Sequence, residues 1–79
     1  MYYVYIIYSE VKDRYYIGHT QDVEERIATH NKLRNLGAND WVLKYKEDYE
    51  TRGLAMKREN EIKRKKRRSY LEMLISSVG

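Results

Sequence analysis

Two charged side chains, Glu59 and Arg26, interrupt the apolar stripes of two expected helices. Glu59 stands four residues after Ala55 and three before Ile62, so its carboxylate is directed toward the margin of a packed face. Arg26 stands three residues after Val23, at the edge of a similar stripe. A charged side chain on the core-facing stripe of a helix costs free energy unless it forms an ion pair or serves a function. Both residues are therefore candidates for a functional site, and the planar fork of arginine suits a phosphate group.

Each of these residues also has a structural interpretation. Glu59 could be a salt-bridged acid at the edge of the core. For Arg26, the alternative is a surface ion pair with Glu47 or Asp48, the commoner case for an isolated arginine. His30, four residues after Arg26, is expected to form a hydrogen bond at the helix end, because no second metal ligand stands at the right spacing.

Tyrosine is the main aromatic residue of the chain, which has nine tyrosines and no phenylalanine. A buried ring could be of either type, but a tyrosine hydroxyl requires a hydrogen-bond partner. Most tyrosines are expected to be core residues with solvated tips. Tyr5 and Tyr16 are the candidates for a functional pair, with hydroxyls emerging on one face of a hairpin. His19, just after the second strand, is open to either interpretation.

Consecutive basic residues near the C-terminus dominate the charge of the chain. They are Lys63, Arg64, Lys65, Lys66, Arg67 and Arg68. The other residues carry ten of the 16 basic side chains and all twelve acidic ones, so the body is slightly acidic despite a net charge of +4. Such a run fits a polyanionic partner, because each phosphate contact releases counterions. The alternative is a solvated stretch between two helices.

The length of 79 residues predicts one small domain, over residues 1–79, that buries about 60% of the surface exposed by its unfolded chain. The absence of cysteine excludes a disulfide framework and a thiolate zinc site, and it suits a reducing cytoplasm. The apolar runs are far shorter than a membrane span, and the N-terminus lacks the layout of a signal peptide. We therefore expect a soluble, cytoplasmic protein with no membrane partner.

A hairpin opens the predicted fold, with strands over residues 2–8 and 14–18 and a polar turn over 9–13. The first strand is apolar or aromatic on both faces, so helices are expected to cover much of both. A third strand is predicted over residues 41–49, after a polar, glycine-containing loop over 31–40.

Helix start signals account for the rest of the chain. Asp22 is the predicted N-cap of a helix over residues 22–32, with Glu25 completing a capping box. Thr51 is the predicted N-cap of a second helix, and Ser69 begins the last helix through another capping box. The predicted fold is α+β: a small three-stranded, mainly antiparallel sheet flanked by helices, in the order β-β-α-β-α-α.

The order and spacing of these features resemble the GIY-YIG nuclease module over nearly the whole chain. The first triplet appears as Tyr3-Val4-Tyr5 and the second is intact as Tyr16-Ile17-Gly18. Residues 22–31 and 55–63 resemble the arginine helix and the glutamate helix of the family. Each motif alone is weak, but their order and spacing together are specific. The length most resembles small stand-alone bacterial members, and Tyr3 replaces the first motif glycine, which could narrow access to the site.

The resemblance implies hydrolysis of a nucleic-acid phosphodiester, with DNA as the expected partner and Mg²⁺ or Mn²⁺ as the cofactor. Glu59 would anchor the metal through a hard oxygen ligand. Tyr5, together with Tyr16, would orient or deprotonate the attacking water. An unperturbed tyrosine is a poor base at neutral pH, so a nearby cation would have to help.

The other implied roles concern the phosphate and the backbone. Arg26 would stabilise charge that develops on the phosphate, and His30 would position or relay a proton. Gly18 would let the backbone turn beside the site. The basic run over residues 63–68 would hold the flanking nucleic-acid backbone without reading bases.

A metal-dependent endonuclease acting on structured or single-stranded DNA, as in DNA repair or recombination, is therefore the favoured function. The alternative is a nucleic-acid-binding module with the same fold and little cleavage, because so small a domain has little surface for a substrate. A third class is a protein-interaction domain whose tyrosine-rich surface binds an acidic partner. The retention of Tyr5, Tyr16, Arg26 and Glu59 argues against both alternatives. The sequence does not determine the oligomeric state, and a monomer is one of the possible states.

Overall fold

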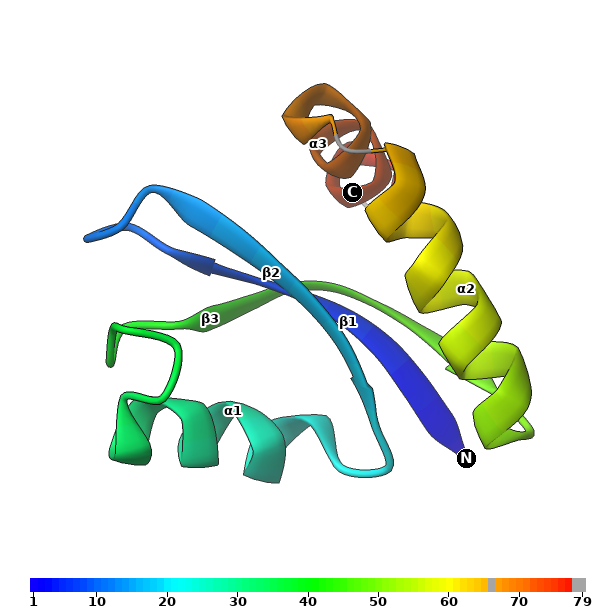
Figure 1. The fold of residues 1–79 in the computed structure, drawn as a ribbon, viewed down its shortest axis with the longest axis horizontal. Helices are drawn as coiled ribbons and strands as arrows, with labels where there is room; N and C mark the ends of the chain where they lie inside the picture. The colour runs from blue at the N-terminus through cyan, green and yellow to red at the C-terminus, as the bar shows by residue number, and fades with distance from the viewer. Residues whose placement is uncertain (66, 78–79) are drawn as a thin grey trace.

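A computed structural model describes residues 1–65 and 67–77 of the chain, so Lys66 of the basic run lies outside the described residues. Its elements follow the predicted order and the fold is α+β, as expected (Figure 1). They are β1 (Tyr2–Ser9), β2 (Arg14–Thr20), α1 (Val23–Leu33), β3 (Val42–Tyr49), α2 (Arg52–Lys65) and α3 (Arg68–Ser76). No helix among the described residues combines the length and the apolar character needed to cross a membrane.

The three strands form an antiparallel sheet in the order β2-β1-β3, with β1 in the centre. The hairpin register places Tyr5 opposite Gly18. The turn of the hairpin is tied to the loop before β3, because the buried Ser9 hydroxyl donates to Asp40 over 2.6 Å and the Val11 N–H donates to the same carboxylate over 3.0 Å. The sheet edge that carries the second motif is thereby held in place.

Helices cover both faces of the central strand, as predicted from its sequence (Figure 1). On one face, Val4 and Ile6 pack with Ala55 and Ile62 of α2 and Leu71 of α3. The other face is covered by α1 and by the loop that follows it. There the core consists of Tyr5, Ile7, Val23, Ala38 and Trp41. Alternation along one strand thus produces two separate cores, one on each side of the sheet.

Two of the three predicted helix caps form. The Asp22 side chain accepts from the Glu25 N–H over 3.0 Å, and Thr51 Oγ1 accepts from the Leu54 N–H over 3.2 Å. The reciprocal half of the first capping box is not made, since the Asp22 N–H donates to Thr20 Oγ1 over 3.2 Å instead.

The predicted cap at Ser69 is wrong. The last helix begins one residue earlier, at Arg68, and the extended residue Arg67 is its N-cap, without a side-chain capping bond. The carbonyl of Arg67 accepts from the N–H groups of Tyr70 and Leu71 over 3.1 and 3.4 Å. Ser69 therefore lies inside the first turn, where its side chain cannot cap the helix.

Candidate active site

Tyr5 is buried at the centre of the α1 face, and its side chain is only 2% exposed. Its hydroxyl lies 3.2 Å from Nε2 of His30, itself a buried residue in the last turn of α1. Nδ1 of His30 lies 2.9 Å from the side-chain oxygen of Asn35, which accepts a hydrogen bond. In the neutral imidazole, Nδ1 then carries the proton and Nε2 accepts from the Tyr5 hydroxyl. The structure thus joins two of the candidate catalytic residues directly.

Gly18 makes room for the Tyr5 ring and does not form a turn, which corrects the role expected from the sequence. It lies within β2, opposite Tyr5, and its φ angle is not positive. A Cβ atom at this position would stand 2.6 Å from the Tyr5 hydroxyl oxygen and 2.8 Å from Cζ. A glycine in a strand often marks such a close approach.

Tyr16 stands beside Tyr5 on the same face of the hairpin, as the sequence predicted. The two ring centroids are 6.4 Å apart. The half-buried Tyr16 ring also meets the edge of His30 at 5.5 Å and of Trp41 at 6.4 Å. Among the described residues, its hydroxyl forms no hydrogen bond with another side chain, so Tyr16 presents an available polar group.

Glu59 approaches from the opposite face of the sheet, on α2, and its side chain is 13% exposed. One carboxylate oxygen lies 2.6 Å from Nδ1 of His19, and the other lies 2.6 Å from Nζ of Lys63. Partial burial opposes ionisation of the carboxyl, but the hydrogen bonds from Lys63 and His19 outweigh it and hold the Glu59 pKa below its ordinary value. Glu59 is therefore an ionised carboxylate whose two oxygens both have partners.

His19 is the site residue that the sequence left ambiguous. It lies near the end of β2, on the face opposite Gly18, and this is the face that α2 covers. Strand alternation from the intact second triplet would have directed its side chain toward the glutamate helix. The interpretation of Glu59 as a salt-bridged acid is correct in that its carboxylate is paired with both His19 and Lys63.

Arg26 is exposed on α1, and among the described residues it makes no ion pair with Glu47 or Asp48. Glu47 is instead held bidentately by Arg58, with nitrogen–oxygen distances of 2.9 and 3.1 Å. The surface ion pair considered for Arg26 is therefore wrong. Its guanidinium is available to a ligand.

A cleft of about 530 Å³ lies beside the N-terminus of α1 and contains Arg26. His19 lines another part of it, and Arg52, the first residue of α2, contributes a second arginine that the sequence did not single out. The remaining lining residues are Tyr2, Thr20, Gln21, Asp22, Glu25 and Thr29. The cleft thus brings one arginine from each of α1 and α2 to the end of β2 near His19, together with the carboxylates of Asp22 and Glu25.

The surroundings of Tyr5 raise the pKa of its hydroxyl. Burial, and next the neighbouring Tyr16, raise the pKa of Tyr5 to about 12, while the charge of Arg26 opposes this and that of Glu59 adds to it. A phenol with a pKa of about 12 keeps its proton at neutral pH, so Tyr5 is a hydrogen-bond donor rather than a base.

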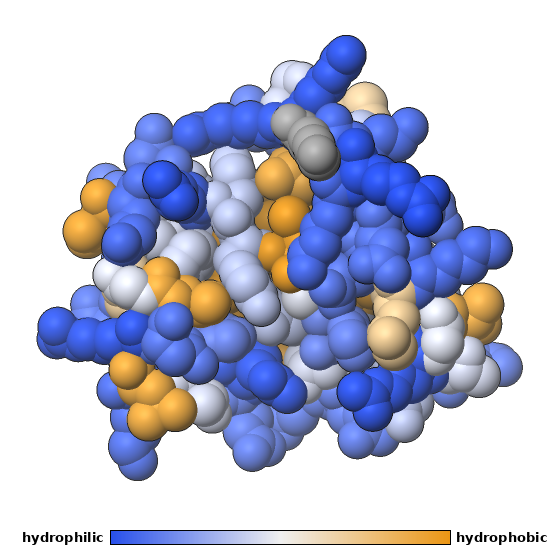
Figure 2. Space-filling model, viewed as in Figure 1, coloured by the Kyte–Doolittle hydropathy of each residue, from blue (hydrophilic) through white to orange (hydrophobic). Residues whose placement is uncertain are grey.

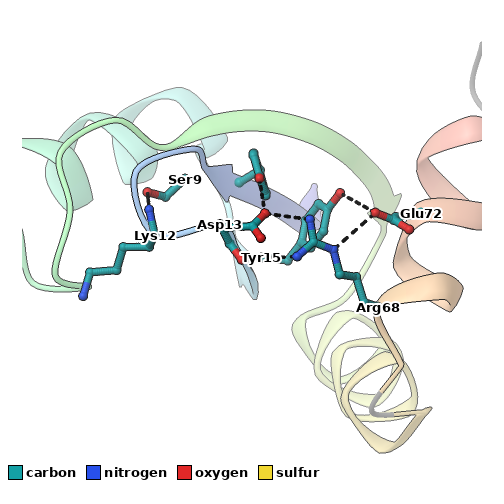
Figure 3. Close-up of polar contacts among 7 residues, drawn as sticks. Ser9, Lys12, Asp13, Tyr15, Arg68 and Glu72 are labelled. Carbon is teal, nitrogen blue, oxygen red and sulfur yellow. Dashed lines mark hydrogen bonds and ion pairs between the residues drawn. The ribbon is translucent and has the colours of Figure 1, made fainter.

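The described residues of the basic run differ in their surroundings. Lys63, Arg64 and Lys65 are the last turn of α2, and Lys63 is bound to Glu59. Arg68 fastens α3 to the hairpin, because its guanidinium pairs with Asp13 over 2.7 Å and with Glu72 over 3.3 Å (Figure 3). It also stands over the ring of Tyr15, 5.2 Å from the centroid. Arg64 and Arg67 are exposed, and neither side chain forms an ion pair with another described residue.

The comparison with known proteins agrees with this architecture. The family model of the GIY-YIG catalytic domain matches residues 1–72, a segment that includes both tyrosines, Arg26, His30 and Glu59. The chain belongs to the GIY-YIG family. It is similar to the UPF0213 protein SH2523 of Staphylococcus haemolyticus (strain JCSC1435), with 40% identity over 77 residues, which is 91% of this chain and 92% of the relative. No solved structure matches the chain significantly.

Proposed function

We propose that this chain is a metal-dependent endonuclease that hydrolyses phosphodiester bonds in structured or single-stranded DNA. The observation that carries the proposal is the arrangement of His19, Arg26 and Arg52 around one cleft, with His19 bound to the carboxylate of Glu59 over 2.6 Å. Two arginines suited to phosphates thus lie beside a histidine that an ionised carboxylate orients. Family membership supports the same class of activity.

The donor set fits a hard divalent cation that keeps most of its water. Glu59 is the one ionised carboxylate of the motif, and the described residues contain no cluster of three or more acidic, histidine or cysteine ligands. Mg²⁺ commonly binds through one or two carboxylates plus waters and substrate phosphates, so Glu59 would suffice as its protein ligand. When bound, Mg²⁺ or Mn²⁺ would polarise the scissile phosphate and offset its charge. Lys63, whose side chain is 47% exposed, would leave the carboxylate oxygen that it now holds.

The phosphate would be held by Arg26, whose free guanidinium faces the cleft. Its planar fork can donate two parallel hydrogen bonds to phosphate oxygens, and these bonds strengthen as negative charge develops. Arg52 in the same cleft would hold an adjacent phosphate of the strand. Arg64 and Arg67, with Lys65, would contact the backbone farther from the site.

Tyrosine and histidine would have separate tasks on the two faces of β2. The protonated Tyr5 would fix His30, and the free hydroxyl of Tyr16 on the same face would donate to the substrate. On the opposite face, His19 would accept the proton of the attacking water, because its Nδ1 is directed to Glu59 and its other ring nitrogen remains available at the cleft. A histidine oriented by a carboxylate is the usual form of a general base.

A panel of labelled single-stranded, flapped, branched and duplex oligonucleotides tests the proposal. We expect cleavage of some unpaired or structured substrates with Mg²⁺ or Mn²⁺ and none with EDTA. Binding without cleavage in every metal would overturn it in favour of a nucleic-acid-binding module with the same fold. That alternative has an observation of its own, since both oxygens of Glu59 are hydrogen-bonded within the chain.

The Tyr5→Phe variant separates chemistry from packing. The sequence predicted a hydroxyl that emerges from one face of the hairpin, but Tyr5 is buried and its hydroxyl is bonded to His30. We therefore expect a loss of about 1 kcal/mol in unfolding free energy together with a large fall in turnover. Urea denaturation and single-turnover cleavage measure the two effects. Tyr3→Phe, on the same strand and face, is the matched control, and equal losses in both variants would remove Tyr5 from the site.

A further inference from the structure

A second groove of about 360 Å³ runs between β2 and the helices α2 and α3. Its floor is apolar and consists of Tyr15 and Ile17 from β2, Ile62 from α2 and Leu71 from α3. Figure 2 shows hydrophobic side chains at the bottom of a hollow between β2 and the two helices, surrounded by hydrophilic ones. The floor is a continuation of the core on this face of the sheet, in which Ile62 and Leu71 are buried and Tyr15 and Ile17 are half-buried.

The rim of this groove is cationic. Arg14, Lys63, Arg67 and Arg68 line it, with Asp13 as the acidic member. Asp13 is neutralised by Arg68, which pairs with it over 2.7 Å. Among the described residues, Arg14 and Arg67 form no ion pair, so two arginines on opposite sides of an apolar floor are available to an anion.

The groove continues directly into the candidate active site. Lys63 lines the groove and also donates to Glu59 over 2.6 Å. On the other wall, Ile17 of the floor stands two residues before His19 on β2, so both side chains lie on the same face of the strand. A ligand that reaches Glu59 and His19 can therefore extend into the groove without leaving the surface.

We propose that this groove binds one unpaired base of the nucleic acid, next to the phosphodiester that is cut. This inference rests on the proposed nuclease function. The apolar floor accepts the face of a base, while the flanking arginines match the phosphates on either side of it. A base within a duplex is stacked and cannot enter such a groove, so the proposal selects a single-stranded or extruded nucleotide. The charge of the rim disfavours an apolar peptide as the occupant.

The experiment measures binding in EDTA, where no cleavage intervenes. A fluorescent single-stranded oligonucleotide is compared with the same strand containing a central run of abasic residues. We expect wild type to bind the intact strand about tenfold more tightly. Ile17→Trp, which fills the groove with a fixed ring, should bind both strands equally. Chemical-shift mapping of wild type with a trinucleotide should move the amides of Tyr15, Ile17 and Leu71, and this readout does not depend on the folding of any variant.

The rim is tested with a charge-matched pair of variants. Arg14→Gln combined with Arg67→Gln should reduce the slope of log affinity against log salt by roughly 0.7 for each phosphate that the rim no longer binds. The control combines Lys57→Gln with Lys32→Gln, two exposed basic residues that line neither the groove nor the cleft, and it should retain a steeper slope.

Equal affinity of wild type for intact and abasic strands, or shifts confined to the Arg26 side, would overturn the proposal. The proposal would also be overturned if the groove were a dimer interface. In that case wild type would sediment as a dimer and the Ile17→Trp variant as a monomer. The two proposals can fail separately. If the protein cleaves DNA but binds intact and abasic strands equally, only the base-binding proposal is wrong. If it prefers the intact strand but never cleaves, only the proposed nuclease function is wrong.

Discussion

Replacement of Glu59 by glutamine is expected to lower single-turnover cleavage by about a thousandfold, because it removes the carboxylate that we propose as the metal ligand while keeping the volume of the side chain. The fold should survive. Glutamine can still accept from His19, and the pair with Lys63 that disappears is largely a surface interaction worth less than about 1 kcal/mol. Urea denaturation and oligonucleotide binding in EDTA should therefore remain close to wild type while cleavage disappears.

Glu61→Gln provides the matched control for this variant. Glu61 stands two residues farther along α2, its side chain is 49% exposed, and its ion pair is a long contact of 3.8 Å with Arg58. Its replacement removes the same charge from the same helix but should leave turnover unchanged. Activity of the Glu59 variant within a few-fold of wild type at saturating Mg²⁺ would end its assignment as the metal anchor.

Gly18→Ala is expected to cost about 1–3 kcal/mol of unfolding free energy, because the added methyl group would overlap the ring of Tyr5 in a packed core. The ring can yield only by leaving His30, so turnover should fall together with stability. Denaturant unfolding and single-turnover cleavage, measured on one preparation at a temperature where the variant is folded, report both effects.

Gly53→Ala is the control for the alanine substitution. No atom stands within 4 Å of a Cβ at Gly53, which lies in α2, so alanine there should stabilise the chain by about 0.5–1 kcal/mol through helix propensity. If Gly18→Ala leaves both stability and cleavage at wild-type values, the Tyr5 ring can adopt another position without loss of function.

Local signals in the sequence predicted most of the fold. Asp22 and Thr51 are caps because short polar side chains there meet the free N–H groups of a helix start, an interaction within a few residues. The two buried faces of β1 followed from its unbroken apolar pattern. Ser69 is not the cap because the backbone is already extended at Arg67 and the helix begins at Arg68. The Arg68 side chain is bound by Asp13, which is distant in the sequence.

The candidate site was predicted as a set of residues but not as a set of contacts. Spacing indicated Tyr5, Tyr16, Arg26 and Glu59, and the structure adds the contacts of the two tyrosines and of Glu59. The partner of Glu59 lies 40 residues away on another element, and pairing over that separation depends on strand register and helix rotation together.

The two halves of the site rest on different cores. Tyr5 and His30 belong to the layer built on Val23 and Trp41, whereas Glu59 lies on the helix whose packing includes Ile62. The two layers share the backbone of β1 as a partition. Losses of unfolding free energy from core substitutions in one layer should therefore add to those in the other, as expected for residues with no shared partners. The packing of one layer can change while that of the other stays as it is.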